Sequence, residues 1–211
     1  LSITGLYAYA ATLDVTILSE MEDDDDKLLK QPMDAAVTTI GTSTYVIVSS
    51  YTNDGVEIID ITDPASPTSV GRVSDDSTSG GCDSTQVCLD GANGSAITTI
   101  NDKTYAIIVA TFDDGIEIID ISDPTSPTSV GSLGDDSNNR AHDGGAGCDS
   151  TEVCLDGAKE AGIYTINDKT YAVVTATHDD GVEIIDISDP TSPTSVGRIT
   201  DRDDTTRELD G

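Results

Sequence analysis

The sequence is poor in aromatic and basic residues, and both shortages limit what the protein can do. It has no Trp, one Phe and seven Tyr, so its core must be built mainly from Ile, Val, Leu and Ala. Only 10 Lys and Arg residues stand against 40 Asp and Glu residues, which gives a formal net charge of −30. Because nucleic acids and anionic membrane surfaces are bound by basic surfaces, neither is an expected partner.

The sequence also lacks any apolar run close to the roughly 20 residues that a membrane-spanning helix needs. The first 18 residues contain no basic segment and do not have the pattern of a signal peptide, so we expect them to be mature sequence. Stretches that favour a helix are scarce, because β-branched residues, Gly and Pro interrupt the chain throughout. An all-β fold is therefore predicted.

One segment of the chain occurs three times. The line DDGIEIIDISDPTSPTSVG at 113–131 recurs almost unchanged at 179–197 and, in a looser form, at 53–71. Tyr105 and Tyr171 occupy equivalent positions, so one period measures 171 − 105 = 66 residues. A period of this size is typical of stacked supersecondary units, each of which needs a neighbour to bury its faces.

Each unit is predicted to contain four antiparallel strands. In the second unit we expect them at 95–100, 104–111, 116–121 and 128–133. The second strand is a near-continuous apolar run, as in a strand that is buried on both faces. A hairpin turn with Gly115 at positive φ should follow it. Pro124 and Pro127 should interrupt the ladder before the outer strand, because proline donates no backbone hydrogen bond.

The repeated segment resembles the LVIVD repeat of β-propeller proteins, a family found in large secreted or surface-exposed prokaryotic chains. The resemblance covers Tyr45–Val73, Tyr105–Leu133 and Tyr171–Ile199, where a strand, an Asp-Gly turn, an IID strand and a Pro-x-x-Pro turn recur in order. It implies β-propeller-like four-stranded blades in tandem, and it implies no chemistry. Since closed propellers have about 4–8 blades, three complete blades predict an array that is open or completed by neighbouring chains.

The predicted organisation alternates blades with acidic loops. We expect an N-terminal β segment at 1–33, blades at 34–74, 95–134 and 160–200, acidic loops at 75–94 and 135–159, and the start of a further linker at 201–211. The N-terminal segment is a candidate for completing a blade or joining another subunit, since exposed strand edges are templates for pairing. The pattern RELDG at Arg207–Gly211 repeats the VCLDG that precedes the second and third blades.

Each acidic loop holds a C-x5-C pair, Cys82 with Cys88 and Cys148 with Cys154. A disulfide within each loop is the favoured pairing in such Gly- and Ser-rich segments. A zinc site is the less favoured alternative, because it needs shorter spacing and a second pair of ligands. Disulfides imply an oxidising compartment, so we expect an extracellular or cell-surface location.

The same loops concentrate carboxylates, which are the ligands that calcium prefers. No stretch has the spacing of an EF-hand, so solvated acidic turns are the competing interpretation. The aspartate pairs at 113–114 and 179–180 are interpreted as turn residues. The candidate calcium ligands are Asp75, Asp76, Asp83, Asp90, Asp135, Asp136, Asp143, Asp149 and Asp156.

No catalytic constellation is predicted. His142 lies in a loop insertion, and His178 lies at a hairpin tip where the sister repeats carry Phe112 and Thr52. We interpret His178 as a solvated turn residue, because the repeat does not require a histidine there. A nucleophile and its base need an asymmetric site, which near-identical blades do not offer. A glutamate with an expected structural or inter-blade role recurs in the third strand of every repeat, at Glu57, Glu117 and Glu183.

These patterns predict a non-catalytic extracellular structural repeat protein. We expect a subunit of a filament or surface assembly that polymerises through its terminal blade strands. The alternative is a propeller binding module of a larger surface protein, with a glycan or protein ligand and with calcium as a candidate cofactor. Asn93 begins the only N-x-[ST] sequon, in a segment expected to be a loop, and is a candidate glycosylation site.

Overall fold

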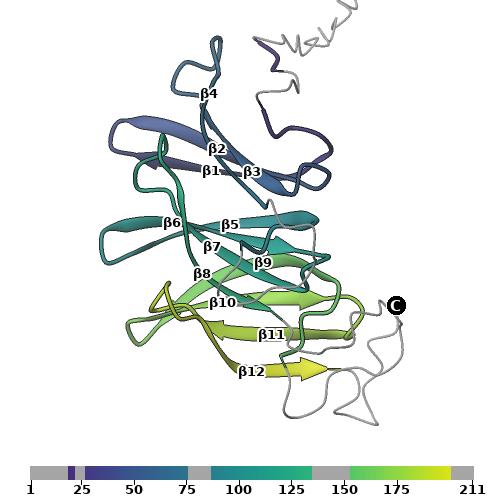
Figure 1. Ribbon diagram of the computed structural model, residues 1–211. Coiled ribbons are helices and arrows are strands. Elements are labelled where there is room, and N and C mark those ends of the chain that lie inside the picture. The colour runs from purple at the N-terminus through teal and green to yellow at the C-terminus, as the bar shows by residue number, and fades with distance from the viewer. Residues whose placement is uncertain (1–18, 22–26, 76–86, 135–152, 201–211) are drawn as a thin grey trace, which may run out of the picture.

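The computed structural model describes residues 19–21, 27–75, 87–134 and 153–200 (Figure 1). Within these residues the chain forms twelve strands and no helix. The described part of the chain accordingly contains no helix that is long and apolar enough to cross a membrane. The strands form three antiparallel four-stranded sheets, so the predicted all-β fold of tandem propeller-like blades is confirmed.

Each repeat forms one sheet in which consecutive strands pair, and each sheet is one blade. Blade 1 consists of β1 (Pro32–Ile40), β2 (Ser43–Ser50), β3 (Gly55–Asp60) and β4 (Thr68–Ser74). Blade 2 consists of β5 (Ala92–Ile100), β6 (Lys103–Ala110), β7 (Gly115–Asp120) and β8 (Thr128–Gly134). Blade 3 consists of β9 (Ala158–Ile166), β10 (Lys169–Ala176), β11 (Gly181–Asp186) and β12 (Thr194–Thr200).

The first strands begin slightly earlier than the predicted blade boundaries at 34, 95 and 160. They start at Pro32, Ala92 and Ala158 because the ladder continues across a register shift near its end. Such a β-bulge inserts an unpaired residue without ending the strand. A pattern of alternating apolar residues does not reveal this continuation, since the extra residues include Gly and Asn.

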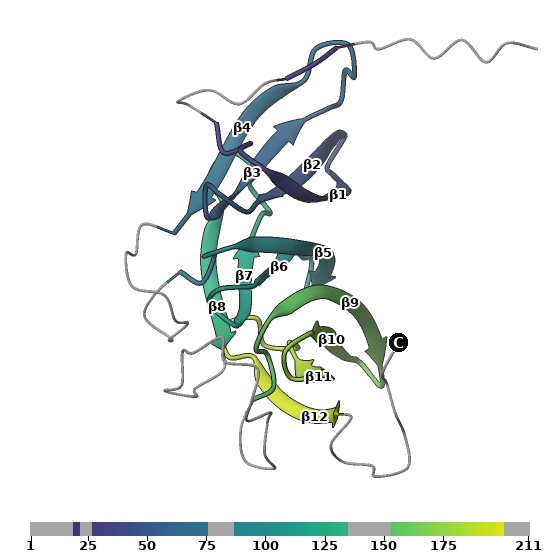
Figure 2. The same ribbon diagram turned by 90° about the vertical axis from the view of Figure 1, so that its right-hand side faces the viewer.

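The three blades stack face to face in chain order along a curved array (Figure 2). The first strands β1, β5 and β9 lie next to one another. The fourth strands β4, β8 and β12 follow the opposite side of the array (Figure 2). This is the arrangement of a propeller sector, in which the first strands line the inner rim.

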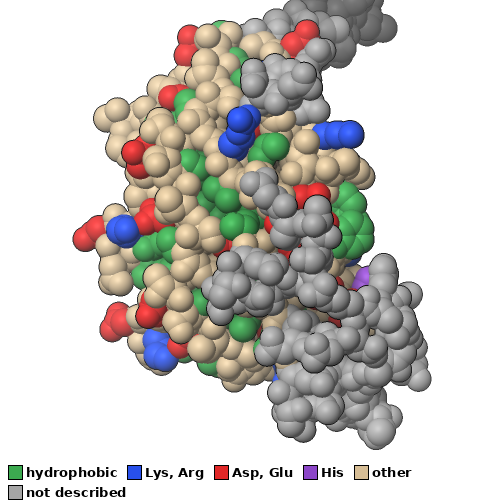
Figure 3. All heavy atoms as spheres, in the orientation of Figure 1, with side chains coloured by type: hydrophobic (Ala, Val, Ile, Leu, Met, Phe, Trp, Pro, Cys, Tyr) green, Lys and Arg blue, Asp and Glu red, His purple; other side chains and the backbone are tan. Residues whose placement is uncertain are grey.

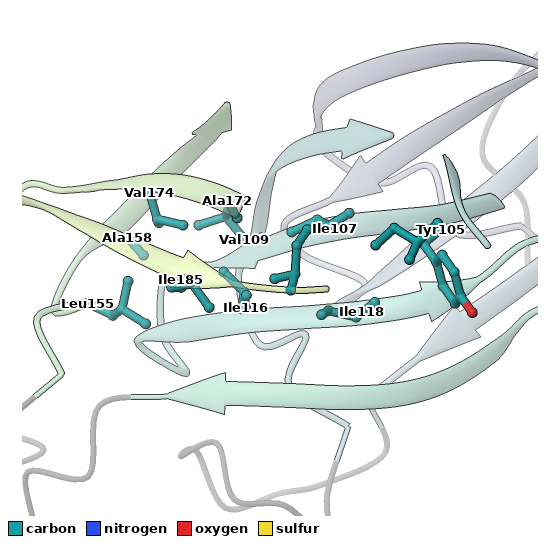
Figure 4. Packing of buried hydrophobic residues seen from close by; sticks show 12 residues of the cluster. Tyr105, Ile107, Val109, Ile116, Ile118, Leu155, Ala158, Ala172, Val174 and Ile185 are labelled. Carbon is teal, nitrogen blue, oxygen red and sulfur yellow. The ribbon is translucent and has the colours of Figure 1, made fainter. Parts of the chain in front are cut away.

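An apolar layer fills each space between blades. In the second layer, side chains of β6 and β7 face side chains of blade 3 and of its entrance (Figure 4). These buried residues include Ile107, Val109, Ile116 and Ile118 opposite Leu155, Ala172, Val174 and Ile185. Blade 2 is covered on both faces, which explains the continuous apolar run of its second strand. No blade buries its own faces, so each depends on a neighbour.

The turn between the second and third strands differs from the prediction in one respect. Positive φ falls on Asp114 (50°) and on the equivalent aspartates, whereas Gly115 is the first residue of β7. Aspartate tolerates the left-handed conformation. The glycine is needed for close packing instead. At Gly55, the equivalent residue of blade 1, an added Cβ would lie 2.7 Å from the carbonyl oxygen of Val73 in the outer strand. It allows the outer strand to approach closely.

Candidate inter-blade junction

Many of the predicted loop residues lie outside the described part of the chain. These are Cys82, Cys148, Asp76, Asp83, Asp135, Asp136, Asp143, Asp149 and His142. Cys88 and Cys154 lie at the entrances of their blades, are fully buried, and are not free thiols. The pairing of each with the other cysteine of its loop remains a prediction, as does a calcium site in the loops.

The three candidate calcium ligands that are described do not form one group. Asp75 follows β4 and Asp90 precedes β5 at the first junction, whereas Asp156 precedes β9 at the second. No cluster of three or more His, Cys, Asp and Glu residues suited to a metal ion was found in 19–21, 27–75, 87–134 and 153–200.

The tip of each second hairpin reaches into the next blade. Asp54 Oδ1 accepts a hydrogen bond from the backbone N–H of Gly91 at 3.0 Å, and Asp114 Oδ1 accepts one from Gly157 at 2.9 Å. Both glycines have positive φ, 68° and 66°, and both stand just before a first strand. The two junctions between blades therefore share the same charged hydrogen bond.

In blades 2 and 3, the first aspartate of the tip acts within its own blade. Asp113 Oδ2 accepts a hydrogen bond from the N–H of Asp90 at 2.8 Å, and Asp179 Oδ2 accepts one from Asp156 at 2.9 Å. The paired aspartates that we interpreted as plain turn residues thus have two separate roles. One fixes the entrance of its own blade, and the next one fixes the entrance of the following blade.

The recurring glutamate of the third strand also holds a blade entrance. Glu117 is fully buried, and its Oε2 accepts a hydrogen bond from the N–H of Cys88 at 2.8 Å. Its other carboxylate oxygen accepts a hydrogen bond from the hydroxyl of Ser129 in the outer strand. Glu57 and Glu183 make equivalent bonds, so the structural role expected from their repetition is observed.

Burial changes the titration of these carboxyl groups. It raises the pKa of Glu117 to about 7, although the hydrogen bonds from Ser129 and Cys88 oppose the shift. Burial, together with the nearby charges of Asp54 and Asp113, raises the pKa of Asp90 to about 6. A raised carboxyl pKa can mark a catalytic acid. Here, however, both oxygens of Glu117 are engaged by contacts that every blade repeats.

The outer strand of each blade touches the Asp-Pro turn of the next. A Cβ on Gly71 would lie 2.1 Å from the carbonyl oxygen of Pro124, and one on Gly131 would lie 2.3 Å from that of Pro190. Only glycine permits such an approach. At the equivalent Gly197 of blade 3, the nearest atom to an added Cβ is a methyl carbon of Ile184, at 4.0 Å.

Asn93 does not lie in a loop, as we predicted, but in β5, with 8% of its surface exposed. Its Nδ2 donates a hydrogen bond to Thr111 Oγ1 at 3.1 Å, and this hydroxyl donates to the carbonyl oxygen of Ala158 in blade 3 at 2.8 Å. The prediction failed because the ladder continues back to Ala92. In the folded chain, the nitrogen that would carry a glycan is part of a buried polar network.

His178 is half-buried rather than a solvated turn residue. Its Nδ1 lies 3.1 Å from Asp156 Oδ1. Its ring packs over Gly157, where an added Cβ would meet Nδ1 at 2.2 Å. Phe112 covers Gly91 in the same way in blade 2. This position therefore shields the glycine whose backbone N–H donates the inter-blade hydrogen bond.

Together, the sheets and junctions define a propeller-like repeat protein in which one set of contacts joins successive blades. The LVIVD repeat profile matches residues 44–75, 104–135 and 170–201. The chain belongs to the LVIVD-repeat β-propeller family, as the sequence resemblance implied.

Solved structures share the fold at low sequence identity. A protein from Lactobacillus plantarum has a TM-score of 0.52 and 15% identity over 85% of this chain and 44% of that one. A functionally unknown protein from Desulfotomaculum acetoxidans DSM 771 has a TM-score of 0.50 and 13% identity, over 80% and 42% of the two chains. An exo-beta-1,3-galactanase from Phanerochaete chrysosporium has a TM-score of 0.50 and 10% identity, over 79% and 35%.

This chain spans less than half the length of each of these structures. The likeness therefore shows the fold alone. A comparison with curated proteins found no match.

Proposed function

We propose that the protein is a non-catalytic structural repeat protein that acts outside the cell as a subunit of a filament or surface assembly. The observation that carries this proposal is that its two junctions share the same principal contacts. Asp54 with Gly91 and Asp114 with Gly157 make the same hydrogen bond between blades. A stack whose units meet through one repeated set of contacts can be extended by further units without a new kind of interface.

The side chains with catalytic potential support the proposal because the repeat already uses them in its own structure. Glu117 binds the N–H of Cys88 and the hydroxyl of Ser129. His178 packs over Gly157 and lies beside Asp156. The galactanase in the comparison shares only the fold, so its activity is not carried over.

The predicted compartment fits this role. A disulfide in each acidic loop would suit an oxidising environment. The described surface carries many acidic side chains, which lie along the edges of the blades, while apolar side chains appear only in small groups on the face in Figure 3.

A propeller binding module for a glycan or protein is the second candidate. It is favoured by polar groups on the inner rim, where Asp34 Oδ2 accepts hydrogen bonds from the N–H and hydroxyl of Ser95, both at 2.8 Å. Glu160 lies close by, and burial together with the charge of Asp34 raises its pKa. Carboxylates grouped in this way suit a hydroxyl-rich ligand or a calcium ion.

Electron microscopy of the native protein at neutral pH separates the two functions. Regular filaments or sheets are expected for the structural subunit. Discrete particles that do not associate would contradict it and favour the binding module. In that case, the melting temperature should be compared with and without calcium and a chelator. A shift on adding calcium would support a calcium-dependent module, since a ligand that binds only the folded state stabilises it.

A further inference from the structure

Blade 3 has an exposed apolar face. The equivalent faces of blades 1 and 2 are each covered by the next blade in the chain. We define the forward face of a blade as the face that meets the next blade along the chain. On blade 3, Ile166 is 53% exposed, Val196 54% and Ile199 60%. The equivalent residue of Ile166 in blade 2, Ile100, is 8% exposed because it packs against blade 3.

The polar and steric elements of a junction are also present on this face. Asp180 has the same positive φ as Asp54 and Asp114, 48° against 49° and 50°, yet it is exposed where they are half-buried. Gly197 occupies the position at which Gly71 and Gly131 receive a proline carbonyl oxygen. The forward face of blade 3 therefore has the turn aspartate, the outer-strand glycine and the apolar residues that join blades inside the chain.

Blade 1 presents the complementary face. We define the back face as the one that meets the preceding blade. Pro64 is exposed, whereas the equivalent Pro124 and Pro190 are buried by the blade before them. Val37, on the first strand, is 61% exposed, whereas its counterpart Ile97 packs against the first core layer.

The entrance of blade 1 has a glutamine at the position where the other two entrances have a glycine. Gln31 stands in the place of Gly91 and has a similar φ, 57° against 68°. The side chain of Gln31 has room because the residue that covers this position in blade 1 is Thr52, which is smaller than the equivalent Phe112 of blade 2. Thr52 Oγ1 donates a hydrogen bond to Gln31 Oε1 at 2.8 Å. The backbone N–H of Gln31 is thus presented in the conformation used at the other two entrances.

We propose that the forward face of blade 3 binds the back face of blade 1 of a second copy of this chain. The carbonyl oxygen of Pro64 would lie against Gly197, and the N–H of Gln31 would donate to Asp180. The hydroxyl of Ser19 donates to the same carbonyl at 2.7 Å. The two contacts are compatible, because a carbonyl oxygen has two lone pairs and Gly197 would approach with its Cα.

This head-to-tail contact rests on the proposed function and specifies how the subunits would join. The two faces are different surfaces of the same chain, so the interface is heterologous. Such an interface builds a ring when the rotation closes and an open filament when it does not. Burial of the exposed apolar residues of both faces would drive the association.

Two single substitutions test the contact in the chain of 211 residues. Gly197→Ala adds a methyl group where the second copy would arrive, while the chain itself leaves 4.0 Å of space. Val37→Asp places a charge on the back face of blade 1. Ser126→Asp, in the exposed turn of blade 2, is the control for added charge. Sedimentation velocity over a range of concentrations gives the size of each species.

The wild type and Ser126→Asp should form larger species, and Gly197→Ala and Val37→Asp should each remain monomeric. An equimolar mixture of the last two should form dimers, because each supplies the face that the other has lost. If a melting curve shows that Gly197→Ala is unfolded, Ile199→Asp takes its place.

Three results would overturn the inference, and only one of them would also overturn the proposed function. Assembly of Gly197→Ala equal to that of the wild type, or a mixture that stays monomeric, would refute the proposed contact and leave the structural function standing. A wild type that is monomeric at every concentration would refute both.

Discussion

Asp114 accepts a hydrogen bond from the N–H of Gly157, a residue 43 positions later that belongs to the next blade. Asp54 and Gly91 repeat this relationship at the first junction. The two bonds connect the tip of one hairpin to the entrance of the following sheet. Because both are charge-assisted and partly buried, they contribute to the alignment of the blades as well as to stability.

The contribution of this bond can be measured against an internal control. Asp114→Ala should lower the free energy of unfolding by about 1–3 kcal/mol more than Asp180→Ala, because it leaves a partly buried N–H without its acceptor. Both substitutions place alanine at positive φ, so the backbone penalty cancels in the comparison. Urea denaturation of the two variants at neutral pH measures the difference. Equal losses would mean that the bond adds nothing to stability.

The glycines of the outer strands offer a second matched pair. Gly131→Ala should cost about 2 kcal/mol or more, because its Cβ would lie 2.3 Å from the carbonyl oxygen of Pro190 and the backbones would have to separate. Gly197→Ala should change stability by no more than about 0.5 kcal/mol in the monomer. Thermal unfolding at low protein concentration checks both values. A large loss at Gly197 would show that close packing of blades is not the reason for the glycine.

The chain should become more stable as the pH falls from about 8 to about 5. Burial raises the pKa of Glu117 to about 7 from 4.5, so between these values the folded state binds more protons than the unfolded state. Stability therefore increases as the pH falls through 7 toward 4.5, by on the order of 1–3 kcal/mol for this group. Urea unfolding at pH 8 and pH 5 measures the change.

Glu117→Gln removes this titrating group and should reduce the slope of the profile, to which Asp90, with a pKa raised to about 6, still contributes. Asp123→Asn in an exposed turn should leave the slope unchanged. At lower pH the sign reverses. Hydrogen bonding to Lys169 lowers the pKa of Asp186 to about 2, so its stabilising effect is lost as the pH falls below about 4. A profile that is flat from pH 8 to pH 5 in the wild type would contradict the account of Glu117.

The cysteines should form two disulfides, one in each acidic loop. Thiol titration of the unreduced, denatured protein should then detect no free thiol among the four cysteines. Reduction should lower the melting temperature, because a short closed loop contributes on the order of 2 kcal/mol. Peptide mapping should recover Cys82 with Cys88 and Cys148 with Cys154. Four reactive thiols would exclude the disulfides and remove the main reason for expecting an oxidising compartment.

The blades could be predicted from the sequence because they depend on local patterns. The apolar run of β6 and the two prolines after β7 mark the strands and their ends, and the threefold repetition fixes how many sheets to expect. The family resemblance added the propeller arrangement, in which the faces of successive blades meet.

The junctions could not be predicted in the same way, because their partners are far apart in the sequence. Nothing local distinguishes Asp113, which binds its own blade, from Asp114, which binds the next one. Asn93 was misplaced because the irregular pairing that carries β5 back to Ala92 has no local sequence signal. Its bond to Thr111 is connected to Ala158 only when two blades are stacked.

One internal signal could have revealed the blade entrances. In blade 2, the aromatic ring of Phe112 covers Gly91. In blade 1, the equivalent residues are Gln31 and Thr52, so the larger residue at the entrance is paired with a smaller covering residue. Such paired changes between copies of a repeat indicate contact, because the added volume at one position needs space at the other. The comparison of copies within one chain therefore contains contact information that a single copy lacks.

The most direct test of the account is a cryo-electron microscopy map of the assembled wild-type chain at a resolution that shows side chains. We expect blade 1 of one copy to continue the stack of blade 3 of another, with the carbonyl of Pro64 on Gly197 and the N–H of Gln31 at Asp180. An assembly in which the forward face of blade 3 remains exposed to solvent would contradict the claim that one repeated junction joins blades both within and between chains.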